Sequence, residues 1–95
     1  MFNIKVEEDN TIQLSGRFDA SQTENAKRVF NEVVSTSYID FKNLDYISSA
    51  GLGVLLMTQK RLNETGYQLI LKNMNNHIRE IFKYAGFDMI FEIDN

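Results

Sequence analysis

Two adjacent serines, Ser48 and Ser49, are the residues of this chain whose position best suits them to chemistry. They follow an apolar stretch and stand directly before Ala50-Gly51-Leu52-Gly53, where a helix is predicted to begin. A hydroxyl at a helix N-terminus lies beside unpaired backbone N–H groups and the positive end of the helix dipole. Both features would favour a phosphate carried by such a serine. The alternative is ordinary helix capping, worth ~0.5–2 kcal/mol.

The glycines that follow the serines help to decide which kinds of site this segment can form. Gly51 has no Cβ, so we expect it to let a partner's backbone approach closely and to matter more for contact than for folding. Gly51-Leu52-Gly53 begins like a dinucleotide-binding motif, but Leu56 occupies the third glycine position and excludes that reading. The serines also lack the flanking glycines of a nucleophile elbow.

Other residue types offer little for catalysis. Asp40 and Asp45 could pair as catalytic carboxylates. The simpler interpretation is that Asp40 closes a strand and Asp45 lies in a turn. The single histidine, His77, is expected on the surface in the first turn of a helix, and no cysteine is present. These counts disfavour a His-based metal site or a catalytic triad and exclude thiolate sites. We therefore expect no metal or cofactor, and a binding or regulatory domain rather than an enzyme.

Length and charge limit the class of partner. With 95 residues, the chain is expected to form one domain over residues 1–95. Its 10 Lys and Arg residues stand against 13 Asp and Glu residues without a basic run, which disfavours nucleic-acid binding. The most apolar stretch, residues 50–57, is far shorter than the ~20 residues needed to span a bilayer. The charged N-terminus lacks a signal-peptide pattern, so we expect a cytoplasmic protein without membrane contact.

The predicted elements alternate strands and helices after an initial hairpin. Alternating residues predict two strands at 2–6 and 12–14, and Ser21 with Glu24 resembles a capping box that would open a helix over about 22–34. The remaining elements are strands at 37–41, 67–71 and 89–93 and helices at about 50–64 and from Asn75 to Gly86. The order β-β-α-β-α-β-α-β predicts an α/β domain with a mixed sheet, because β-α-β crossovers pair their strands in parallel.

The segment from Leu44 to Leu56 resembles the signature of anti-sigma factor antagonists, the STAS-domain family. In that pattern an apolar turn leads to Asp-Ser-Ser/Ala-Gly-Leu at the start of a helix, and here the block reads Ser-Ser-Ala-Gly-Leu. Residues 14–19 are similar to the family's Gly-Glu-Leu-Asp segment, and residues 78–87 to its last helix and the following turn. The resemblance covers nearly the whole chain.

The resemblance implies a STAS-like fold and a non-enzymatic switch. Such a protein binds an anti-sigma factor that is also a serine kinase and thereby frees a sigma factor. The kinase ends the complex by phosphorylating a serine, and a phosphatase resets it. The phosphorylated serine of the family falls on Ser49, and Asp40 matches a strand-end acidic position. The residues expected at the partner interface are Asp19, Asp40, Ser48, Ser49, Ala50, Gly51 and Leu52.

One departure from the family pattern keeps alternatives open. The residue before the acceptor is commonly Asp in the family and is Ser48 here, which removes a carboxylate and leaves Ser48 as a possible second acceptor. The first alternative is therefore a STAS domain that scaffolds another complex and is never phosphorylated. The second is a small enzyme that uses Asp40 or Asp45 together with Ser49.

Overall fold

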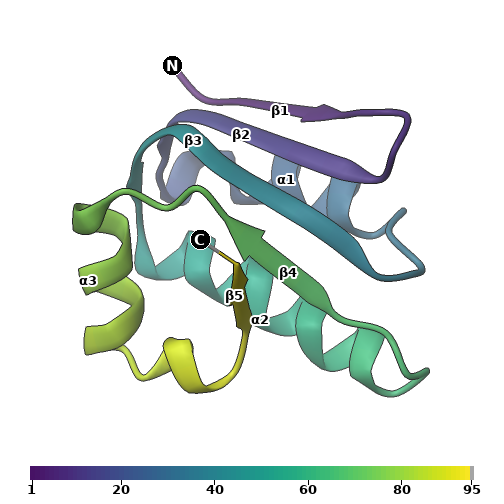
Figure 1. Cartoon of the computed structure of the whole chain (residues 1–95). Helices are drawn as coiled ribbons and strands as arrows, with labels where there is room; N and C mark the ends of the chain where they lie inside the picture. Colours follow the sequence, from purple (N-terminus) through teal and green to yellow (C-terminus); the bar gives the residue numbers. More distant parts are fainter. Residues whose placement is uncertain (95) are drawn as a thin grey trace.

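Five strands and three α-helices alternate along residues 1–94, the part of the chain that the computed structural model describes (Figure 1). The first half contains β1 (Asn3–Val6), β2 (Thr11–Phe18), the 3-10 turn η1 (Ala20–Gln22), α1 (Thr23–Phe30) and β3 (Ser37–Ile47). The second half contains α2 (Ser49–Asn63), β4 (Leu69–Lys72), α3 (Asn76–Tyr84), the 3-10 turn η2 (Phe87–Met89) and β5 (Glu92–Asp94). The predicted α/β class and order of elements are confirmed.

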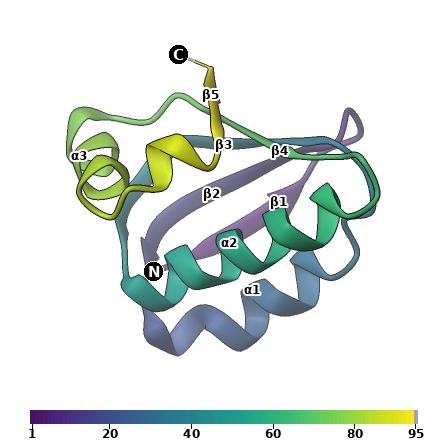
Figure 2. The same ribbon diagram turned by 90° about the horizontal axis from the view of Figure 1, so that it is seen from below.

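The five strands form one mixed sheet in the order β1-β2-β3-β4-β5. β1 pairs with β2 antiparallel, as the predicted hairpin requires, and the other neighbouring strands are parallel. Figure 2 shows α1 and α2 side by side beneath one face of the sheet, with α3 at the end where β3 and β4 terminate. The starts of α1, α2 and α3 therefore all lie toward the carboxyl ends of the parallel strands.

The core lies between the helices and the sheet and is rich in aromatic side chains. Phe82 of α3 is fully buried and packs edge to face against Phe41 of β3, with ring centroids 5.7 Å apart. Gln59 of α2 is buried, and both the oxygen and the nitrogen of its amide are hydrogen-bonded. Its Oε1 accepts from the backbone N–H of Leu69 at 2.8 Å, and its Nε2 donates to the carbonyl of Ile90 at 3.1 Å. This one side chain thus ties α2 to the start of β4 and to the segment before β5.

The third strand is longer than predicted. It was expected to end at Phe41, but it continues to Ile47 and includes the residues expected in a loop. The pairing of β2 with β3 shifts register between Gln13 and Ser15 and again between Gly16 and Arg17, and each shift adds a residue to β3. The buried positions of β3 are consequently spaced by two residues at first and by three residues later. A bulged strand loses the period of two that identifies strands in a sequence.

Other predicted boundaries also differ. The second strand, predicted at 12–14, spans Thr11–Phe18, because it continues alongside β3 to the strand end. The helix expected from about residue 22 to 34 has its α-helical part at Thr23–Phe30, and Ser21 does not cap it. The N-cap of α1 is Gln22, whose side chain makes no capping hydrogen bond. Asp19 instead caps the preceding η1 turn by accepting from the backbone N–H of Ser21. The last strand was expected at 89–93 but spans Glu92–Asp94, because the chain after Gly86 first forms the η2 turn.

Candidate functional site

The serine pair lies where the two longest parallel strands end side by side. Phe18, the last residue of β2, is in register with Ile47, the last residue of β3. The pairing continues one residue further, because the backbone N–H of Ser48 donates to the carbonyl of Phe18 at 2.9 Å. The backbone that leads into α2 is therefore held in place by the sheet. Figure 2 shows this start of α2 beside the start of α1.

The two serines have different environments. Ser48 is the N-cap of α2: it is half-buried, and its Oγ accepts from the backbone N–H of Gly51 at 3.1 Å. Ser49 is the first residue of the helix and is exposed, as is Ala50. Ordinary capping therefore accounts for Ser48, whereas Ser49 presents its hydroxyl to solvent beside the first turn of α2. The side chain of Ser49 is therefore the more exposed of the two.

Gly51 faces the interior, which corrects the expectation that it serves contact more than folding. It is buried, and a Cβ added to it would lie 2.9 Å from Cγ1 of Ile47 and 3.1 Å from Cγ of Phe18. Both contacts are closer than ordinary van der Waals distance. The next residue, Leu52, is also buried, with 6% of its surface exposed. The side-chain surface available to a partner is thus formed by residues 48–50, and the glycine allows α2 to pack against the strand ends.

Asp19 lies next to the serines in space. It follows Phe18 directly, so it stands at the carboxyl end of β2 as Ser48 stands at that of β3. Its carboxylate accepts from the hydroxyl and the backbone N–H of Ser21, and these hydrogen bonds hold the pKa of Asp19 below its usual value. The η1 turn that it opens contacts α2. The predicted grouping of Asp19 with the serine pair is consistent with this arrangement, and contact with a partner there stays a prediction.

Asp40 is far from the serines, contrary to its expected position at a strand end. It is the fourth residue of β3, and Ser48 is eight positions further along the chain, roughly 25 Å at ~3.3 Å per residue. Its carboxylate accepts from the backbone N–H of Lys42 at 2.9 Å and from Nδ2 of Asn73 at 3.0 Å. Asp45 lies within β3 rather than in a turn. A catalytic pairing of Asp40 with Ser49 is therefore excluded by geometry.

Two residues near the site were not predicted from the sequence. Arg17 of β2 and Tyr46 of β3 are register partners one residue before the strand ends, and the guanidinium carbon lies 4.3 Å from the centre of the tyrosine ring. This cation–π pair places a positive charge close to Asp19, whose carboxylate it helps to keep ionised. The signal for it in the sequence is weak, because the register of β2 and β3 depends on the bulges.

The described residues show neither a metal site nor a membrane span. Within residues 1–94, no three His, Cys, Asp or Glu side chains gather closely enough to hold a metal ion. Over the same range, no helix combines the length and the apolar character that crossing a bilayer demands. His77 is exposed, as expected for a surface residue in the first turn of α3.

Comparison with known proteins shows the family. The sequence model described as "Mlab, STAS domain" matches residues 4–92. The chain is similar to BtrV of Bordetella bronchiseptica, named as a candidate anti-sigma factor antagonist, with 36% identity over 90% of this chain and 67% of the relative. It is also similar to a STAS-domain containing protein of Pseudomonas aeruginosa, with 29% identity over 87% of this chain and 85% of the relative. The chain belongs to the STAS-domain family.

Solved structures agree on the fold. The anti-sigma factor antagonist SpoIIAA in its unphosphorylated form superposes with a TM-score of 0.76 at 20% identity, covering 100% of this chain and 89% of that chain. The phosphorylated form of SpoIIAA from Bacillus gives a TM-score of 0.70 at 20% identity, covering 100% of this chain and 92% of that one. Family membership identifies this chain as a regulatory binding domain and not an enzyme.

Proposed function

We propose that this protein is an anti-sigma factor antagonist switched off by phosphorylation of Ser49. The observation that carries the proposal is the contrast within the serine pair: Ser48 caps α2 with its hydroxyl, while Ser49 is exposed at the first position of the same helix. The names of the relatives support the antagonist function, and the two solved forms of SpoIIAA show that a protein of this fold carries a phosphate. The proposed setting is the cytoplasm, where sigma factors act.

The proposed partner is an anti-sigma factor that is also a serine kinase. In the unmodified state the exposed surface of residues 48–50, with Asp19 beside it, would contact this partner and release its sigma factor. The kinase would then transfer the γ-phosphoryl group of ATP to Oγ of Ser49, releasing ADP and the hydroxyl proton. A phosphatase would hydrolyse the phosphoserine with water, releasing inorganic phosphate and resetting the switch. No step requires a metal or cofactor held by this chain.

The physical basis of the switch is a charge placed at a contact surface. A phosphate adds about −1.5 to −2 charges and is favoured by the N-terminus of α2 while it stays solvated. The exposed position of Ser49 means that the phosphate need not displace any core side chain. At an interface formed around a neutral hydroxyl, the same charge would be desolvated, which costs more than the ~1.4 kcal/mol that corresponds to tenfold in affinity. Phosphorylation should therefore block binding without refolding the domain.

The test is phosphoryl transfer and binding with the cognate kinase. After incubation with ATP and that kinase, mass spectrometry should find one phosphate, absent in Ser49→Ala. It should persist in Ser48→Ala and in Ser21→Ala, a matched control that removes a hydroxyl from the neighbouring η1 turn. The phosphorylated protein should bind the kinase more than about tenfold more weakly than the unmodified protein. Phosphate found only on Ser48 would contradict the assignment of the acceptor.

The second candidate is a STAS domain that scaffolds a signalling complex without being phosphorylated. The residue before Ser49 supports it, because Ser48 stands where the family pattern commonly has a carboxylate that could orient the acceptor or a kinase-bound Mg²⁺. In that case the kinase or another partner would bind the protein, and prolonged incubation with ATP would leave the complex intact and the protein unmodified.

A further inference from the structure

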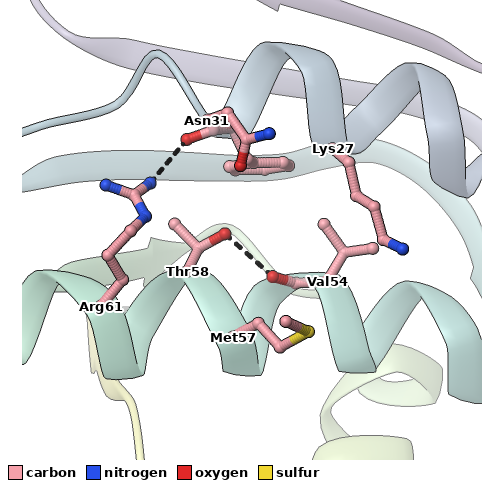
Figure 3. A pocket seen from close by; sticks show the side chains of 7 residues that line it. Lys27, Asn31, Val54, Met57, Thr58 and Arg61 are labelled. Atoms are coloured by element: carbon pink, nitrogen blue, oxygen red, sulfur yellow. Dashed lines mark hydrogen bonds between the residues drawn. The ribbon is translucent and has the colours of Figure 1, made fainter.

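A second surface feature, separate from the serine pair, is a groove between α1 and α2. Its volume is about 330 Å³, and we call it the α1–α2 groove (Figure 3). Its apolar lining comes from Phe30 and Val54, which are both buried, and from Met57, which is 66% exposed. An exposed methionine next to buried apolar groups is a flexible contact surface that adapts to a partner's side chain.

Each end of the α1–α2 groove carries a basic side chain. Lys27 of α1 lies over Val54 at one end, and Arg61 of α2 lies beneath Asn31 at the other (Figure 3). Val54 and Arg61 are seven residues apart on one helix, so the two ends are separated by roughly 10 Å at ~1.5 Å per residue. The groove is thus an apolar strip with one cation at each end.

This charge pattern differs from that of the rest of the chain. The whole protein has a formal net charge of −3, but α1 and α2 together carry Lys27, Arg28, Lys60 and Arg61 against one acidic residue, Glu24. Glu24 lies 3.9 Å from Lys27, one turn earlier on the exposed side of α1, and its side chain is 84% exposed. Such a pair is weak and leaves the ammonium group accessible to another carboxylate.

Arg61 is held in position and still has donors for a ligand. Its Nη2 donates to the carbonyl of Phe30 at 2.9 Å, at the C-terminal end of α1. This bond uses one of the five N–H donors of the guanidinium group and tethers the group to the end of α1. The remaining donors suit a carboxylate, which arginine binds through two parallel hydrogen bonds.

We propose that the α1–α2 groove docks an acidic amphipathic helix of a partner protein. Two carboxylates about two helical turns apart would pair with Lys27 and Arg61, and an apolar side chain between them would contact Met57 and Val54. A fatty acid has a single carboxylate and could pair with only one of the two cations, so their separation favours the peptide. The proposal does not depend on Ser49 or on the identity of the anti-sigma factor.

The test uses a synthetic helical peptide of about sixteen residues, built on alanine, with two glutamates two turns apart and a leucine between them. In titrations followed by amide NMR shifts at low salt, we expect the changes to concentrate at Asn31, Val54, Met57 and Thr58. A peptide with glutamine in place of both glutamates should bind at least about fivefold more weakly. Decanoate is titrated separately as the competing ligand.

A pair of variants on one helix makes the test specific. Lys27→Gln should weaken binding of the glutamate peptide by about fivefold, while Arg28→Gln, which removes the same charge outside the groove lining, should change it by less than about twofold. The proposal is overturned if the glutamate peptide at about 1 mM shifts none of the groove amides, or if both peptides bind equally. If decanoate shifts the groove amides and the peptide does not, the ligand of the groove is a lipid-like amphiphile and the proposal is wrong.

Discussion

The surface around Ser48–Ala50, here called the serine edge, and the α1–α2 groove are built in different ways. At the serine edge the geometry is fixed by backbone groups: Ser48 donates to Phe18 through its N–H, and its hydroxyl accepts from the N–H of Gly51. In the α1–α2 groove the polar contacts come from long side chains, with Arg61 reaching across from α2 to the end of α1. The serine edge is therefore held by short backbone hydrogen bonds, whereas the groove is lined by longer, basic side chains.

Under the two proposals, the serine edge serves modification and the groove serves recognition. An edge held by backbone hydrogen bonds would present one hydroxyl in a constant geometry, and a phosphate added there would change binding while the fold stays the same. An adaptable groove recognises the charge pattern of a ligand, and salt or substitution of one cation alters its affinity. We therefore expect changes in packing beneath the serine edge to alter stability. We expect changes of surface charge at the groove to alter the affinity for a ligand.

The largest expected effect is at the glycine beneath the serine edge. Gly51→Val should lower the free energy of unfolding by about 3 kcal/mol, because its side chain would overlap Ile47 and the Phe18 ring. The control is Gly53→Ala in the same helix, where an added Cβ meets nothing within 4 Å. It should stabilise the protein by about 0.5–1 kcal/mol through helix propensity. Urea denaturation measures both, and equal stability of the two variants would disprove the packing role of Gly51.

A smaller difference in the free energy of unfolding should distinguish the two serines. Ser48→Ala should cost about 1 kcal/mol, because the backbone N–H of Gly51 loses its cap. Ser49→Ala should change the free energy of unfolding by less than about 0.5 kcal/mol, as is typical of an exposed residue. Thermal and urea denaturation of the two single variants provide the comparison. The reverse order of costs would mean that Ser49, and not Ser48, caps α2.

The groove should tolerate loss of a charge with almost no loss of stability. Lys27→Gln removes the 3.9 Å contact with Glu24 and shortens a side chain that lies at the groove surface, so the free energy of unfolding should change by less than about 0.5 kcal/mol. Urea denaturation should therefore show the same midpoint within error, at low salt and at high salt. A large destabilisation would show that the lysine supports the packing of α1 instead of serving the surface.

The smallest effect concerns the pH dependence of the serine edge. Hydrogen bonds from Ser21 lower the pKa of Asp19 in the folded protein. A lowered folded pKa means that Asp19 stabilises the fold above its unfolded pKa near 3.8, and that this stabilisation is lost as the pH falls through the folded value. NMR titration of the Asp19 carboxyl carbon should give a midpoint below 3.8 that rises in Ser21→Ala. A midpoint unchanged by that substitution would remove Ser21 as the cause.

Much of the fold was predictable because its signals are local. The cap of α3 by Asn75 is confirmed: its side chain accepts from the N–H of Ile78 at 2.8 Å. The start of α2 was predicted within one residue. The length of β3 was not predictable, since bulges formed with β2 set its register, and a bulge depends on a partner strand distant in sequence. The same long-range dependence hid the pairing of Arg17 with Tyr46.

The place of the serine pair in the fold was predicted, but the surroundings of its neighbours were not. Ser48 and Ser49 lie at a strand-to-helix junction as expected, because the Ser-Ser-Ala-Gly-Leu block and the helix that follows are close in sequence. The sequence could not show which face of the helix Gly51 occupies, since a glycine is compatible with both contact and packing. It also placed Asp40 at a strand end, an error that follows directly from the missed second half of β3.

The agreement between strand order in the sheet and strand order in the chain has a consequence for folding. Because β1 to β5 are arranged in sequence order, each new strand adds to the edge of the strands already formed, and none must insert between two earlier ones. The bond between Phe18 and Ser48 that sets the serine edge needs only β2, β3 and the start of α2. During synthesis from the N-terminus, all the groups that form this bond are therefore present before β4, α3 and β5 leave the ribosome.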